Sequence, residues 1–114
     1  MVIEALTSWP DPAYLVHGIG DTLPIRHKVN DQMACLVFDS ERIGDDWINS
    51  VSDSFEMDFE LIPTSIEDCL NILSQMKTND VSLIWVNPPA RATYDAVLHD
   101  LDTTLGFLRQ LRDG

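Results

Sequence analysis

The sequence predicts an α/β fold in which residues 1–114 form a single compact domain. We expect a mostly parallel central sheet of three strands, with antiparallel edge strands from the N-terminal part and three helices. Three apolar segments of strand length, residues 33–38, 57–62 and 81–86, are each followed by a segment with helical periodicity. This repeated order is typical of parallel sheets, because each helix returns the chain to the same end of the sheet. The length of 114 residues suits one hydrophobic core.

The first strand-to-helix unit is centred on the apolar segment Met33–Phe38. Asp39 or Ser40 can cap the following helix, because a side-chain oxygen at this position accepts a hydrogen bond from a free N–H group. We expect this helix over residues 39–51. Its face toward the sheet is indicated by apolar residues at helical spacing, namely Ile43, Trp47, Ile48 and Val51.

The second unit begins with a strict alternation of apolar and acidic residues between Phe55 and Leu61. This alternation predicts a strand with one solvated acidic face. Thr64 and Glu67 have the spacing of a capping box, so the second helix is expected over residues 64–77. One side of this helix is apolar and consists of Ile66, Cys69, Leu70, Leu73 and Met76.

The third unit begins with Val81–Val86, whose four consecutive apolar residues are typical of a strand covered on both faces. Asn87 and the two prolines after it end this strand. A third helix is predicted from Thr93 to about Arg112, because Tyr94, Leu98, Leu101, Leu105 and Leu108 recur at steps of four and three. A helix of about twenty residues is longer than a small sheet needs. The surplus would dock on a second copy of the chain, or the helix is an over-long terminal one.

The N-terminal third predicts edge strands. A short strand over residues 13–16 precedes a turn at 17–21, which lacks the three spaced glycines of a dinucleotide-binding loop. Residues 22–29 alternate between apolar and polar and include Pro24, as expected of an edge strand or hairpin arm. Before them lies a tail in which Trp9 packs on the body of the domain or contributes to an interface.

The charge of the chain excludes some classes of partner. Nineteen acidic residues and seven basic residues give a net charge of −12, which repels nucleic acid and anionic membrane surfaces. The longest stretch without a charged residue has ten residues, Val81–Ala90, whereas a membrane-spanning helix needs about twenty. The first residues lack the basic start of a signal peptide. We therefore expect no nucleic-acid partner, no membrane association and a cytoplasmic location.

The acidic residues are concentrated in the middle of the chain. Between Asp39 and Asp68 there are ten acidic residues and a single basic residue, Arg42. Three interpretations remain open: a solvated face that maintains solubility, a docking surface for a basic partner, or an inhibitor that imitates nucleic acid with its carboxylates, for which Asp45 and Asp46 are the test positions.

The sequence predicts no catalytic, cofactor-binding or metal-ligating residue. Cys35 and Cys69 fall on predicted core positions, where reduced structural thiols are expected. The histidines His17, His27 and His99 are scattered, and only His17, near Asp21 in the glycine turn, is placed like a site residue. The acidic row at 53–60 lacks the glycine of a calcium loop.

A non-enzymatic protein therefore fits these residues better than an enzyme does. The alternative is a small enzyme or ligand binder that uses a pocket beyond the strand ends, around Asp39, Asn87 and the Pro88–Pro89 turn, where open α/β sheets usually bind ligands.

Four short motifs in succession resemble the SseB-like domain. They are Leu36–Glu41 (LVFDSE), Trp47 in the following helix, Ile62–Leu70 (IPTSIEDCL) and Leu83–Pro88 (LIWVNP). The resemblance covers roughly residues 33–88, about half of the chain, and leaves out the N-terminal third and the final helix. It implies a compact α/β unit that serves as a non-enzymatic accessory or protein-interaction module, sometimes beside secretion or toxin systems.

From these observations we expect an acidic protein-interaction or adaptor module without a cofactor. Its partner would be a basic protein, or a second copy of the chain bound through the C-terminal helix.

Overall fold

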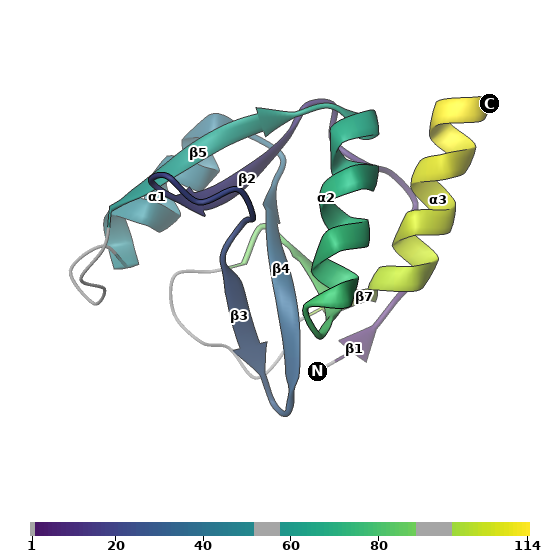
Figure 1. The fold of residues 1–114 in the computed structure, drawn as a ribbon, viewed down its shortest axis with the longest axis horizontal. Helices are drawn as coiled ribbons and strands as arrows, with labels where there is room; N and C mark the ends of the chain where they lie inside the picture. The colour runs from purple at the N-terminus through teal and green to yellow at the C-terminus, as the bar shows by residue number, and fades with distance from the viewer. Residues whose placement is uncertain (1, 52–57, 89–96) are drawn as a thin grey trace.

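A computed structural model describes residues 2–51, 58–88 and 97–114 of the chain (Figure 1). Within these residues, seven strands form one mixed sheet and three helices pack against it. The strands are β1 (Val2–Ile3), β2 (Ala13–Gly18), β3 (Arg26–Val29), β4 (Gln32–Phe38), β5 (Phe59–Thr64), β6 (Val81–Val86) and β7 (Val97–Asp100). The helices are α1 (Glu41–Val51), α2 (Ile66–Thr78) and α3 (Leu101–Asp113).

The strand order is β1-β7-β6-β4-β2-β5, with β3 paired to β4 outside this path. β6 runs parallel to β4 along one side. On its other side, β4 pairs antiparallel with β3 near its start and with β2 near its end. β1 and β7 form a second parallel pair, whereas β2–β5 and β6–β7 are antiparallel. The prediction of a mostly parallel sheet of three strands is therefore wrong.

The placement of β5 accounts for most of this difference. We expected this segment to be one of three parallel central strands, but β5 pairs antiparallel with the whole length of β2. It is an edge strand, which is why it tolerates Pro63, a residue without an N–H group for a second neighbour. The expected alternation is seen from Phe59 to Leu61, where Glu60 is exposed between two half-buried residues. Phe55 and Met57 lie outside the described residues.

The two faces of the sheet carry separate apolar clusters. α2 and α3 lie together on one face, where Cys69, Leu70, Leu73 and Met76 are buried as predicted and Ile66 is half-buried. α1 packs at the other face against β2, β4 and β5.

The apolar face of α1 differs from the prediction at one position. Trp47 is buried and Ile48 and Val51 are half-buried, but Ile43 is 40% exposed. Gly44 takes the place expected for Ile43, because the glycine lies against the side chain of Leu61. A Cβ atom on Gly44 would come within 2.6 Å of Leu61 Cδ1, so the absent side chain allows a close approach of α1 to β5.

The third helix is shorter than predicted. Val97–Asp100 forms β7, whereas residues 93–96 lie outside the described part of the chain. Leu98 is fully buried in the sheet, so its helical spacing from Leu101 is coincidental. The Asp100 carboxylate caps α3 by accepting a hydrogen bond from Thr103 N at 2.9 Å. The leucine stripe of α3 is buried as expected, and its thirteen residues offer no surplus length to a second copy.

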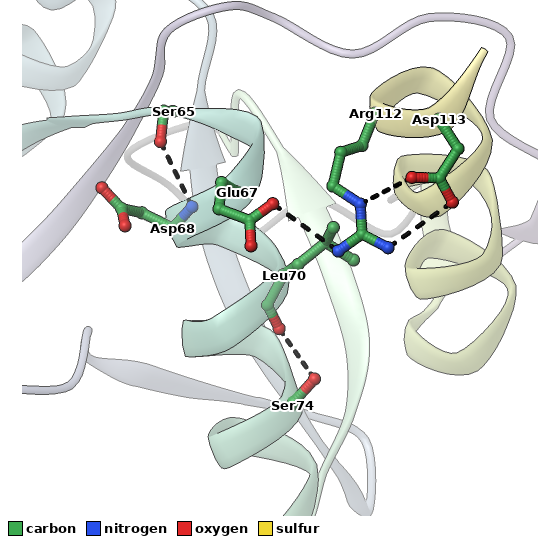
Figure 2. Close-up of polar contacts among 7 residues, drawn as sticks. All are labelled: Ser65, Glu67, Asp68, Leu70, Ser74, Arg112 and Asp113. Atoms are coloured by element: carbon green, nitrogen blue, oxygen red, sulfur yellow. Dashed lines mark hydrogen bonds and ion pairs between the residues drawn. The ribbon is translucent and has the colours of Figure 1, made fainter.

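The capping box predicted Thr64 as the cap of α2, but the cap is Ser65. Ser65 Oγ accepts a hydrogen bond from Asp68 N at 3.2 Å (Figure 2). Thr64 is the last residue of β5 and pairs with Ala13, while its hydroxyl donates to Ile62 O at 3.0 Å. Ser and Thr have similar capping chemistry, so the end of strand pairing decides which of the two begins the helix.

Figure 2 also shows a polar contact between α2 and α3. Arg112 is 3.5 Å from a carboxylate oxygen of Glu67 and forms a second ion pair with its neighbour Asp113. These side chains are largely exposed, so they contribute little to stability. The buried apolar side chains between the two helices hold them together.

Replacing Ser65 by Ala should lower the free energy of unfolding by about 1 kcal/mol, because Asp68 N loses its acceptor. Ser65→Asp is the matched control, since it keeps an acceptor at the cap and should change the stability by less than about 0.5 kcal/mol. Urea denaturation measures both. Equal losses in the two variants would contradict this assignment of the cap.

Two glycine-to-alanine substitutions should change the free energy of unfolding by different amounts or in opposite directions. In α3, Gly106→Ala should raise the free energy of unfolding by about 0.5–1 kcal/mol, because Ala favours the helix and nothing lies within 4 Å of the added methyl group. In α1, Gly44→Ala should gain less or lose stability, since its methyl group meets Leu61. Urea denaturation compares them, and equal gains would mean that α1 does not need the close approach.

Candidate functional site

The structure keeps the three histidines apart. His17 is buried in β2, His27 lies on β3 with its ring centroid 5.9 Å from that of Trp85, and His99 belongs to β7. In residues 2–51, 58–88 and 97–114, none of them forms a hydrogen bond or ion pair with a thiol or a carboxylate. The histidines therefore do not assemble a nucleophile and base within the described chain.

His17 is the histidine that we considered site-like, and its surroundings are unusual. The residue is 2% exposed, and neither ring nitrogen has a hydrogen-bond partner among the described residues. Burial lowers the pKa of His17, because it disfavours the charged imidazolium. The Asp21 main chain and the carboxylates of Glu60 and Asp21 oppose this shift. Glu60 is the cross-strand neighbour of His17 on β5. His17 is thus a neutral core residue near two acids.

The His17 shift has a consequence for stability against pH. The folded pKa lies below the ordinary value of 6.5, so the unfolded chain binds the proton more readily. Stability should therefore be full above about pH 6.5 and fall as the pH drops below it, by at most about 1.4 kcal/mol per pH unit. Urea unfolding between about pH 5.5 and 7.5 measures this slope.

His17→Gln should flatten the slope, whatever its effect on absolute stability. His27→Gln, on an exposed ring, is the matched control and should keep the wild-type slope. An unchanged slope in His17→Gln would show that other groups cause the pH dependence.

The two cysteines are free and buried, as predicted. Burial, with a smaller contribution from Cys69, raises the pKa of Cys35 to about 12. Burial raises the pKa of Cys69 to about 11, although the nearby Trp9 side chain acts in the opposite direction. Both groups therefore remain protonated thiols at neutral pH, and thiols are poor nucleophiles.

A thiol reagent should accordingly react slowly with the folded protein. At pH 8 we expect both cysteines to be labelled by a disulfide reagent only on unfolding, because the thiolate fraction and the access are both small. Absorbance of the released thiolate, with and without about 6 M guanidinium, gives the two rates. Rapid labelling of either cysteine in the native protein would contradict the assignment of these thiols to the core.

A crevice of about 380 Å³ lies at the carboxyl ends of the parallel pair β4 and β6. Residues 4–10 form one wall, and Asp39, Val86 and His99 form the other. Asp39 N donates to Asn87 Oδ1 at 3.0 Å, and Asn87 N donates to Val37 O at 2.7 Å, so the two strand ends are tied together.

The ligand-binding alternative requires a cavity at this place, near Asp39 and Asn87. Pro89, which we also expected beside the pocket, lies outside the described residues. His99 Nδ1 lies 2.8 Å from Glu4 O. A carbonyl can only accept, so Nδ1 carries the proton and Nε2 of a neutral ring is left as an acceptor.

A larger hollow of about 520 Å³ lies beside the connection between β2 and β3. Residues 21–27 form much of its wall, together with Met33, Trp47, Phe59, Met76 and Asn79. We did not predict this hollow, because we expected residues 22–29 to form a continuous strand. Only Arg26–Val29 is β3, whereas Pro24 makes a single bridge to His17. Pro24 and the preceding glycine turn are the signals that could have indicated a loop.

Acidic side chains dominate the outer surface of α1. Glu41, Asp45 and Asp46 are exposed there, and Arg42 is the one base of the helix. We call these three acids the α1 acidic surface. None of them forms an ion pair with another described residue, in contrast to Asp102, which pairs with Lys77 on the other side of the sheet.

The structure and the comparisons with known proteins add three findings. No helix of the described chain is both long and apolar enough to cross a membrane. Among the described residues, no group of three or more His, Cys, Asp or Glu side chains is arranged to hold a metal ion. Neither a scan against protein-family models nor a search of curated proteins finds a match to this chain. The resemblance to the SseB-like domain therefore stays a prediction.

Proposed function

We propose that this protein is an acidic protein-interaction module that binds a basic partner through the α1 acidic surface. The observation that carries the proposal is the set of three exposed carboxylates on one short helix without a pairing cation in the described chain. Such charges retain their field at the surface, whereas ion pairs within the protein would cancel it. A basic segment that docks on α1 would supply the missing cations.

The position of α1 favours this role. The helix packs on the sheet through Gly44 and Trp47, which leaves its charged side toward solvent. The start of α1 is capped within the protein, since Ser40 Oγ accepts a hydrogen bond from Ile43 N at 3.2 Å. A rigid helix presents its carboxylates at fixed positions, and fixed complementary charges increase the association rate and the specificity of binding.

The reactive groups of the chain support a non-enzymatic role. Both thiols are buried and protonated, and His17 is buried and neutral. The resemblance to the SseB-like domain implies the same class of function, a protein-interaction or accessory module. A module of this kind needs a stable scaffold and an accessible surface, and it needs no activated side chain.

The test compares two variants with the same change in charge. Asp45→Asn/Asp46→Asn removes two charges from the α1 acidic surface, and Asp31→Asn/Asp80→Asn removes two exposed charges elsewhere. Immobilised protein is incubated with a cell lysate, and retained proteins are identified by mass spectrometry. We expect the first variant to lose basic proteins that the wild type and the control retain, and we expect added salt to weaken their binding.

Equal retention by both variants, or retention of nothing by the wild type, would overturn the proposal. A retained partner that is a DNA-binding enzyme, competed off by DNA, would identify the protein as an inhibitor that imitates nucleic acid.

A second candidate function is the binding of a small molecule in the crevice at the ends of β4 and β6. The crevice favours it because the Asp39 carboxylate forms no hydrogen bond or ion pair with another described residue and His99 offers Nε2 as an acceptor. Two acceptors suit a ligand with amine or hydroxyl donors. Thermal shifts with a panel of small amines and nucleosides test it. Asp39→Asn should abolish any shift, and an absence of shifts across the panel would rule this function out.

A further inference from the structure

The sheet has three open edges in the described part of the chain, formed by β1, β3 and β5. Two of them carry residues that discourage pairing with another strand. β5 contains Pro63, and β3 consists mainly of charged or titratable residues, including Arg26 and Lys28. β1 has neither a proline nor a charge and is protected only by its length of two residues, since Val2 and Ile3 are apolar and 51% and 50% exposed.

The main chain of β1 offers one donor and one acceptor that have no partner among residues 2–51, 58–88 and 97–114. Glu4 N donates to Leu98 O at 2.9 Å, and Glu4 O lies 2.8 Å from His99 Nδ1, so both groups of Glu4 face β7. Main-chain groups of successive residues in a strand point to opposite sides. Ile3 pairs with Leu98 in this ladder, so its N–H and C=O point away from β7. These groups have the arrangement that an added strand requires.

Apolar side chains flank these free groups. Val2 lies beside Val97 of β7, which is 42% exposed, and the side chain of Ile3 lies on the other face of the sheet. An added strand would cover apolar surface on both faces while its main chain binds Ile3.

We propose that the outer edge of β1 binds an extended segment of another protein by strand addition. The segment has alternating apolar residues and a Lys or Arg placed to meet Glu4, which is exposed and without an ion pair in the described chain. Charge disfavours a second copy as the occupant, since two copies of this edge would bring two Glu4 carboxylates together on chains of net charge −12 each. This site is separate from the α1 acidic surface, which lies at the opposite end of the molecule (Figure 1).

Amide hydrogen exchange followed by NMR tests the proposal with a defined probe. The probe is a seven-residue peptide that alternates Val with Lys and Thr, and the comparison peptide has Pro at the central position. We expect the Val/Lys/Thr peptide, at about ten times its dissociation constant, to slow exchange of the Ile3 amide by about tenfold. The Glu4 amide, already bonded to Leu98, should change much less. The Pro peptide should have no effect, because it cannot complete the ladder.

Variants of the chain separate this site from others. Ile3→Pro removes the outward N–H and should abolish peptide binding, while Ile19→Ala removes an exposed apolar residue elsewhere and should not. Ile3→Lys serves as a second blocking variant if the proline weakens β1. Asp45→Asn/Asp46→Asn should bind the peptide like the wild type, so failure at β1 and failure of the α1 proposal are distinguishable.

Two outcomes would overturn the proposal. One is unchanged Ile3 exchange at millimolar peptide. The other is protection of the Ile3 amide that grows with protein concentration in the absence of peptide, together with a doubled mass in light scattering. That second result would assign the edge to a second copy of the chain.

Discussion

The structure depends on the burial of five consecutive residues of β4, Ala34–Phe38. These residues are at most 1% exposed, so apolar side chains cover both faces of this strand. Burial on both faces leaves no room for unpaired main-chain groups, and β4 accordingly has neighbours along both of its sides. The parallel neighbour β6 has a similar apolar composition and closes one side. The remaining side is long enough for two partners, β3 and β2.

This central pair sets the positions of the helices. Alternate residues of β4 point to opposite faces, so Cys35 and Val37 belong to the cluster under α2 and α3, and Leu36 and Phe38 belong to the cluster under α1. Each helix therefore has a fixed face to cover. Because α1 covers only one end of its face, beside β5 and β2, its charged side projects at the margin of the molecule (Figure 1).

Local patterns in the sequence predicted the elements that are decided locally. The apolar runs gave β4 and β6, and the period of 3.6 residues gave the buried side of α2 and of α3. The patterns did not reveal pairing between distant segments. The antiparallel pairing of β5 with β2 and the strand character of Val97–Asp100 both depend on neighbours far away in the chain. A strand of four residues that precedes a helix without a break has too few positions to distinguish a period of two from one of 3.6.

The candidate sites were also predictable only where residues close together in the sequence form them. The acidity of α1 is visible in the sequence, because a helix brings together residues that are close in the chain. The crevice was expected at Asp39, because ligands collect where parallel strands end, but its other wall was not. That wall consists of residues 4–10, which have no pattern that would place them there. The free edge of β1 could not be inferred from two residues.

The N-terminal segment connects two of these surfaces. β1 continues into residues 4–10, which pass the carboxyl ends of β4 and β6 and bring Trp9 into the core beside Cys69. Glu4 belongs to both surfaces, since its main chain closes the β1–β7 ladder and its carbonyl fixes the proton of His99 at the crevice. A strand added at Ile3 would hold this segment from outside, and a ligand in the crevice would contact it from inside. Both proposed binding events would therefore contact the same N-terminal segment, at its outer edge through Ile3 and at its inner side through the crevice.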